Sequence, residues 1–338
     1  MRQRYPRLLC CLIPLIISFS TAVVMTHQVK NVALSDDDNV ETFYSFANGL
    51  AQYKDERQEW KTRILSNFLV GRLVHVVERA YHSTDPQKVM PRTAALWSFL
   101  WFVAIGIVFV AAFPRRALFY VFGTFTATAF AYTEGVGATR VYPWDMPALF
   151  VFGCFVVLLE LRLQAWLIGL IPIGTLFKET TLLLVIGFLF WPGVSRGRRL
   201  GAIVVSMLLA LTAKGVVDVV TANPSPVLTM TLRDGPGVPR YITNLQHLVA
   251  PSAWTTHPVF VNVGLLASLL VLPNADPRIR MLKMIAVPFI LGNFFFGHII
   301  EYRIWFELIP LSLYALEIHF FGLPSEASVE GRQGNGHA

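Results

Sequence analysis

Long apolar runs, separated by short segments that carry Arg and Lys, constrain this chain more than any other feature. Ten runs can be marked, at residues 8–25, 94–113, 117–133, 147–159, 163–176, 180–191, 202–220, 259–272, 284–297 and 304–321. Runs of this kind are typical of helices that cross a lipid bilayer. We therefore expect an all-α fold, a polytopic transmembrane helical bundle of about ten spans.

The composition agrees with a membrane location. Charged residues make up only 14% of the chain, against about 25% in soluble domains. The net charge of +7 does not indicate nucleic-acid binding, because the basic residues lie largely between apolar runs, where they orient membrane proteins. Cys10, Cys11 and Cys154 lie in apolar runs, so we expect neither a disulfide framework nor a thiolate metal site.

The distribution of basic residues predicts the orientation of the chain. Residues 1–7 are basic, which places the N-terminus in the cytoplasm. The first run suits an uncleaved signal anchor, with a cleaved signal peptide as the alternative. Alternating spans then put 13 of the 28 Lys and Arg residues inside and five in short outer loops. We expect a multi-pass inner (cytoplasmic) membrane protein, with one transmembrane domain at 1–324 and a disordered cytoplasmic tail at 325–338.

Two predicted outer loops are long. In the first, residues 26–92, apolar residues recur at helical spacing over 40–53 and 64–80, which predicts two amphipathic helices on the outer membrane surface. The second of these helices could instead dip into the membrane. The later loop at 221–258 is rich in Pro and Gly and could be a mobile flap or a plain linker.

Acidic residues gather on the predicted outer side. Sixteen of the 21 Asp and Glu residues fall there, including Asp36, Asp37 and Asp38 directly after the first run. A carboxylate at the membrane edge could act as a general base or hold a divalent metal. The alternative is a solvated acidic turn that caps a helix.

Several outer bases could bind a phosphate. Arg63 follows an interfacial Trp60, and Arg140 precedes an aromatic segment that ends at Asp145; the second group could equally be an aromatic belt with one ion pair. Lys178 and Glu179 interrupt an apolar stretch, which is unfavourable unless the two charges are paired or face a cavity.

Two further groups of charges lie later in the chain. Glu301 and Arg303 lie in a predicted tight outer turn, where the carboxylate could hold the base against a phosphate. Lys214 and Asp218 are four residues apart in one run, which favours a mutually neutralising pair. The sequence shows no phosphate-loop, dinucleotide or zinc-protease motif.

The layout resembles the GT-C class of integral-membrane glycosyltransferases. The resemblance covers nearly the whole chain, and the segments Phe177-Lys178-Glu179 and Glu301-Tyr302-Arg303 carry most of it. It implies that an Asp of the 36–38 cluster is the catalytic acid/base. It also implies that Arg63, Lys178 and Arg303 face a carrier phosphate, with Glu179 and Glu301 orienting them. The triple Asp departs from a single acidic motif, and we expect no soluble C-terminal domain after the spans.

We therefore expect a glycosyltransferase that moves sugar from a polyprenyl-phosphate carrier to an acceptor at the extracytoplasmic face. The expected partners are the lipid bilayer and the polyprenyl-phosphate-linked sugar, without nucleic acid. No cofactor is implied with certainty, although a divalent metal remains open. The alternatives are a glycolipid or polysaccharide transporter or flippase, and a polysaccharide polymerase or ligase.

Overall fold

A computed structural model shows an all-helical protein with a single two-residue β pairing in the part of the chain that it describes. That part comprises residues 11–24, 26, 63–129, 142–191, 194–220, 233–234, 238–250, 259–297 and 305–321. An apolar helix, Cys11–Val24, comes first. The expectation of an all-α fold is confirmed.

The later elements follow in chain order. They are α4 (Ile64–Tyr81), α5 (Pro86–Ala112), α6 (Ala117–Ala129), α7 (Asp145–Glu160), α8 (Gln164–Phe177), the 3-10 helix η3 (Glu179–Val185), α9 (Ile186–Leu189), α10 (Arg196–Val220), β1 (Arg233–Asp234), β2 (Val238–Pro239), α11 (Arg240–Val249), α13 (Val259–Val271), α14 (Pro277–Phe296) and α15 (Leu308–Phe321).

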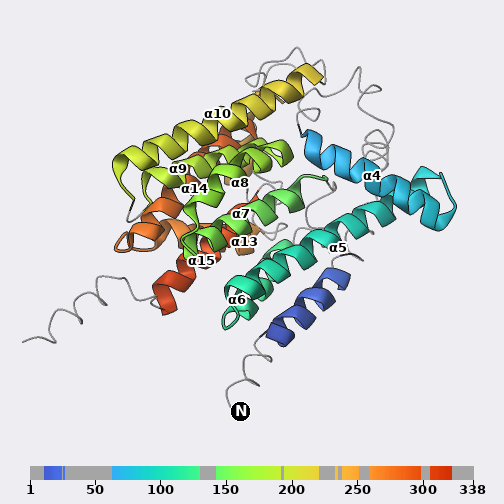
Figure 1. The fold of residues 1–338 in the computed structure, drawn as a ribbon, viewed down its shortest axis with the longest axis horizontal. Helices are drawn as coiled ribbons and strands as arrows, with labels where there is room; N and C mark the ends of the chain where they lie inside the picture. Colours follow the sequence, from blue (N-terminus) through green and yellow to red (C-terminus); the bar gives the residue numbers. More distant parts are fainter. Residues whose placement is uncertain are drawn as a thin grey trace, which may run out of the picture.

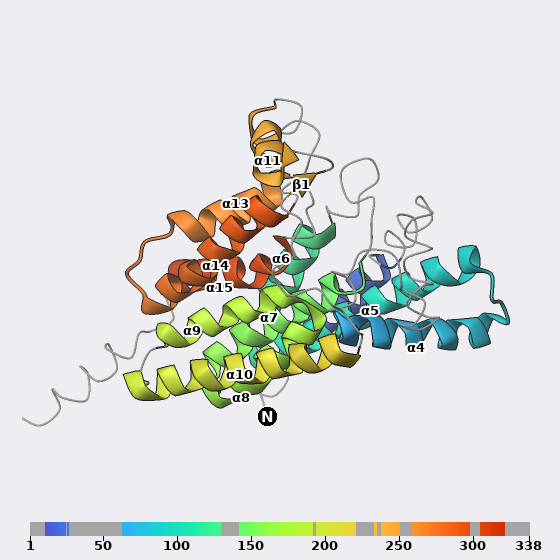
Figure 2. The ribbon, with the colours of Figure 1, turned by 90° about the horizontal axis from the view of Figure 1, so that it is seen from above.

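Helix α7 lies in the middle of the bundle. On one side it packs against α8, which in turn packs against α10, and on the other it packs against α15, which contacts α13 and α14 (Figures 1 and 2). Helices α4 and α5 pack on each other and extend together to one side of the bundle. The side chains of Phe152 and Phe155 on α7 are fully buried, as expected for a central helix.

Two helices begin with the same Asp-Pro signal. The Asp85 carboxylate accepts a hydrogen bond from the Gln87 backbone amide at 3.1 Å, and the Asp276 carboxylate accepts one from the Arg278 amide at 2.7 Å. In both helices Pro occupies the first helical position, where its missing N–H is not needed. This cap explains why α5 begins at Pro86, eight residues before the apolar run at 94–113.

Helices form in each of the ten apolar runs, but their lengths differ. Two are long and apolar enough to cross a membrane by length and composition, Pro86–Ala112 and Arg196–Val217. At 1.5 Å per residue, α5 is about 40 Å long, longer than a hydrocarbon core of about 30 Å. The run at 180–191 is divided into η3 and α9. A crossing by each of the ten runs therefore stays a prediction.

The two long outer loops differ from expectation in different ways. A helix at 64–80 is confirmed as α4, whereas the predicted helix at 40–53 lies outside the described residues. Residues 221–258 were expected to be a flap or linker, but they include the regular helix α11. Its apolar residues Tyr241, Leu245 and Leu248 follow helical spacing, which the Pro and Gly residues before it obscured.

Candidate functional site

Lys178 lies at a break between two helices. Its backbone is extended, with φ −157° and ψ 134°, between the end of α8 and the start of η3. Its Nζ lies 3.3 Å from Asp145 Oδ1 and 2.5 Å from Glu307 Oε1. All three side chains are buried. The break thus places Lys178 against Asp145, the first residue of α7, and against Glu307, in the turn before α15.

Glu179 holds two cations from distant parts of the chain. Arg63 Nε lies 3.1 Å from its Oε2, and Lys214 Nζ lies 3.1 Å from its Oε1. Arg63 is the residue before α4, and Lys214 lies near the end of α10. Glu179 and Arg63 are about one-fifth exposed, while Lys214 is buried. This group therefore has a side that solvent reaches.

Aromatic residues connect the two groups. The Arg63 guanidinium lies 4.2 Å from the centre of the Trp144 ring. Trp144 directly precedes Asp145 in the chain. The Trp144 ring stacks on that of Tyr142, with centroids 4.8 Å apart. The Trp97 indole N–H donates to the Pro143 carbonyl at 2.7 Å. These contacts fix the start of α7 and hold Arg63 in place by a cation–π interaction.

The two groups of ion pairs meet where Lys178 and Glu179 are neighbours in the chain, and together we call them the charge network. It consists of Arg63, Asp145, Lys178, Glu179, Lys214 and Glu307. Among these six side chains, three cations balance three carboxylates. Two cations share Glu179, whereas two carboxylates share Lys178. Counting these six side chains alone, the half with Glu179 has two cations against one carboxylate, and it is the more exposed half, which suits an anion.

The structure brings together three of the residues that the sequence singled out. Arg63, Lys178 and Glu179 all belong to the charge network. The other candidates lie outside the described residues; they are Asp36, Asp37, Asp38, Arg140, Glu301 and Arg303. Whether these six join the network therefore stays a prediction.

Sequence reasoning did not choose the other three members. Asp145 was considered only with Arg140, as a group that could bind a sugar or phosphate, and Glu307 gave no separate signal. Lys214 was expected to neutralise Asp218, but its ammonium lies against Glu179, and the Asp218 side chain is outside the described part. A charge in an apolar run is itself a signal, but its partner depends on which helix packs beside it.

A second group of charges lies at the opposite end of α7. With 15 steps from Asp145 to Glu160, the two ends of this helix are about 22 Å apart. The Tyr314 hydroxyl donates to Glu160 Oε2 at 2.7 Å, and Arg278 lies within 3.8 Å of the same oxygen. Arg278 also pairs with Asp276 at 2.8 Å.

Glu317 completes this second group. Its carboxylate is fully buried and accepts hydrogen bonds from Arg116 and from the Tyr120 hydroxyl. These contacts join α15 to the start of α6. Because each described acid here has a cation or a hydroxyl against it, we assign the second group to holding helix ends together.

Metal ligands do not cluster in the described part of the chain. Among these residues, no three His, Cys, Asp or Glu side chains gather as a metal site would require. The Asp36–Asp38 group, which suggested a divalent metal, lies outside the described residues.

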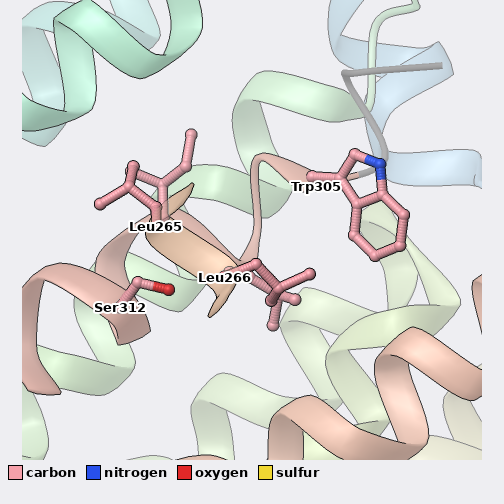
Figure 3. A pocket seen from close by; sticks show the side chains of 6 residues that line it. Leu265, Leu266, Trp305 and Ser312 are labelled. Atoms are coloured by element: carbon pink, nitrogen blue, oxygen red, sulfur yellow. The ribbon is translucent and has the colours of Figure 1, made fainter. Parts of the chain in front are cut away.

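A small apolar cavity lies between α13 and α15, beside the turn that holds Glu307. Leu265, Leu266, Trp305 and Ser312 line it, together with Leu308 and Ile309 (Figure 3). The Ser312 hydroxyl is buried and makes no hydrogen bond within the described structure. The lining is almost wholly apolar, so this cavity does not suit a charged headgroup.

Comparisons with known proteins do not identify the chain. No family model, curated protein or solved structure matches it.

Proposed function

We propose that this protein is a multi-pass membrane glycosyltransferase of the GT-C type. It would transfer a sugar from a polyprenyl-phosphate carrier to an acceptor at the extracytoplasmic face of the inner membrane. The observation that supports the proposal most is that Arg63 and Lys214, 151 positions apart, share the single carboxylate of Glu179. A phosphate on a lipid carrier is the kind of anion that such a pair would bind.

The charge network suggests how the leaving phosphate would be stabilised. As the bond between the anomeric carbon and the phosphate oxygen breaks, negative charge grows on the phosphate. Arg63 and Lys214 are held in place before the reaction, so they would stabilise that charge without reorganising. The Arg63 fork can bind two phosphate oxygens at once.

The acceptor proton needs a base. In the proposed reaction the acceptor hydroxyl oxygen bonds to the anomeric carbon, and its proton passes to a carboxylate. By the resemblance to the GT-C class, that carboxylate belongs to Asp36, Asp37 or Asp38. Lys178 would hold the start of α7 through Asp145, and so would support Arg63 through Trp144.

Donor binding and transfer can be separated by experiment. The purified chain, reconstituted in lipid nanodiscs, is given a panel of radiolabelled polyprenyl-phosphate hexoses and amino sugars, and both binding and release of sugar are measured. We expect Arg63→Ala and Lys214→Ala to weaken donor binding at least tenfold, the change that about 1.4 kcal/mol gives. Arg72→Ala is the matched control, because Arg72 is an exposed cation of α4 stacked on Phe68.

The aspartates test the catalytic step. Asp36→Asn, Asp37→Asn and Asp38→Asn are compared, and one of them should abolish transfer while donor binding persists. The proposal fails if no donor supports transfer or hydrolysis. It also fails if Arg63→Ala and Lys214→Ala both bind the donor as tightly as the unchanged protein does.

Transport of a glycolipid is the competing function. It requires ionisable groups through the depth of the membrane, and α7 carries such groups only at its two ends, Asp145 and Glu160. This spacing favours the enzyme. Movement of a fluorescent polyprenyl-phosphate sugar between the leaflets of reconstituted vesicles, without hydrolysis, would favour transport instead.

A further inference from the structure

Helix α11 has one strongly apolar face, and the side chains on that face are exposed. Tyr241, Leu245, Leu248 and Val249 lie along it at helical spacing, and Leu245 and Val249 are 53% and 72% exposed. Successive residues are rotated by about 100° around a helix, which places Arg240 and His247 on the opposite side. No acidic residue occurs in the helix. A soluble surface helix would turn its apolar face inward, so this arrangement is reversed for an aqueous surface.

The helix is fixed to the end of α14. The Asn244 side-chain amide is buried and donates to the carbonyls of Phe294 and Gly297, at 2.7 and 2.8 Å. Both carbonyls lie at the end of α14, where a helix has no backbone N–H groups of its own to pair with them. The attachment places α11 at the level where α14 ends (Figure 2).

The apolar face of α11 continues an apolar face of α14. The Tyr241 ring contacts that of Phe295, with centroids 6.1 Å apart. From Phe295 an exposed apolar stripe follows α14 back through Leu291, Val287 and Met284. In a spanning helix this stripe would face lipid, and α11 extends it at the level of the headgroups.

We propose that α11 lies in the interfacial layer of the bilayer, with Tyr241, Leu245, Leu248 and Val249 inserted among the lipid chains. An interfacial helix inserts an apolar face by about 5–10 Å while its polar face stays in the headgroups or water. The inference rests on the membrane location proposed above, and not on the transferase activity.

Depth-dependent quenching tests the placement. Single cysteines replace Leu245, Leu248 or Gln246 in full-length protein whose native cysteines are changed to Ala. Each is labelled with an environment-sensitive fluorophore and reconstituted in phosphatidylcholine–phosphatidylglycerol nanodiscs. Gln246 is the matched control, because it is exposed, adjacent to Leu245 and outside the apolar face.

Labels at positions 245 and 248 should be quenched several-fold more by spin-labelled lipid than the label at 246, with the reverse order for aqueous iodide. Equal access of iodide to all three labels would overturn the proposal. So would protection of positions 245 and 248 from both quenchers, since a second copy or a protein partner would then cover the face. Lipid burial of these labels together with absent donor binding would leave this inference standing and refute only the transferase.

Discussion

Lys178 contributes more to stability than a residue in a single ion pair would. It faces two buried carboxylates, Asp145 and Glu307, which come from separate elements. Burying charges is unfavourable unless they are paired closely. The contribution of Lys178 is therefore large, because its removal would leave the fully buried Glu307 without its cation.

Lys178→Met tests this role. We expect the variant to unfold more easily by about 3–5 kcal/mol, the usual effect of breaking a buried ion pair. The second change Glu307→Gln should restore part of the loss, because it removes the charge that Lys178 neutralised. Thermal unfolding in detergent measures both variants. An unchanged melting temperature for Lys178→Met would show that the ammonium is not needed to hold the carboxylates.

At the scale of elements, the close approach of α7 and α8 depends on a glycine. A Cβ built on Gly174 would lie 2.8 Å from Val151 Cγ1 and 3.1 Å from the Thr181 side chain. Atoms at that distance overlap, so the two helices would have to separate. Gly169, on the same helix, has open space where its Cβ would be.

The two glycines give opposite predictions for the same substitution. Gly174→Ala should destabilise the protein by about 1–3 kcal/mol, as overpacking does. Gly169→Ala should leave stability unchanged or raise it by up to about 1 kcal/mol, because Ala is the better helix former. Equal melting temperatures for the two variants would show that α7 and α8 do not meet closely at Gly174.

The start of α14 predicts a dependence on pH. Burial raises the pKa of Asp276, but hydrogen bonds from Arg278 and its charge lower it more, so that the net pKa is below 3.8. The stability from this contact is therefore present above pH 3.8 and is lost as the pH falls through the lowered pKa.

Asp276→Asn isolates that effect. Asn still caps a helix, but it does not titrate. The melting temperature of the variant should therefore fall less than that of the unchanged protein between about pH 5 and pH 2. Arg278→Gln should do the same. A decrease identical to that of the unchanged protein would mean that the Asp276 contact does not contribute.

At the scale of the whole molecule, two groups of charges lie at opposite ends of α7. The charge network includes Asp145, and the second group includes Glu160. If α7 crosses the bilayer, the two groups lie on different sides. Because Arg116 and Arg278 lie near the second group, the positive-inside rule predicts that its side is the cytoplasm.

Labelling of single cysteines tests this orientation in intact cells. Thr84→Cys, between α4 and α5, should react with a membrane-impermeant maleimide added outside. Asn274→Cys, between α13 and α14, should react only after the membrane is opened. Both positions are exposed. Reaction of both positions in intact cells would contradict the proposed topology.

The sequence by itself determined the helical class and the positions of the helices that form in the apolar runs, but not that of α11. Apolar runs specify helices through local spacing and burial, and Asp-Pro caps specify where α5 and α14 begin. The charges that interrupt an apolar run were also visible, since Lys178 and Glu179 are unfavourable there without partners.

Only the tertiary structure decided the partners. Lys214 could meet Asp218 on its own helix, but it meets Glu179 because α10 packs along α8 and η3. Glu307 meets Lys178 because α15 packs against α7, whose first residue already holds that lysine. Such pairings depend on which helix faces which, and local spacing carries no information about that. The reversed apolar face of α11 has the same origin, since Asn244 binds the end of α14 and turns the other side outward.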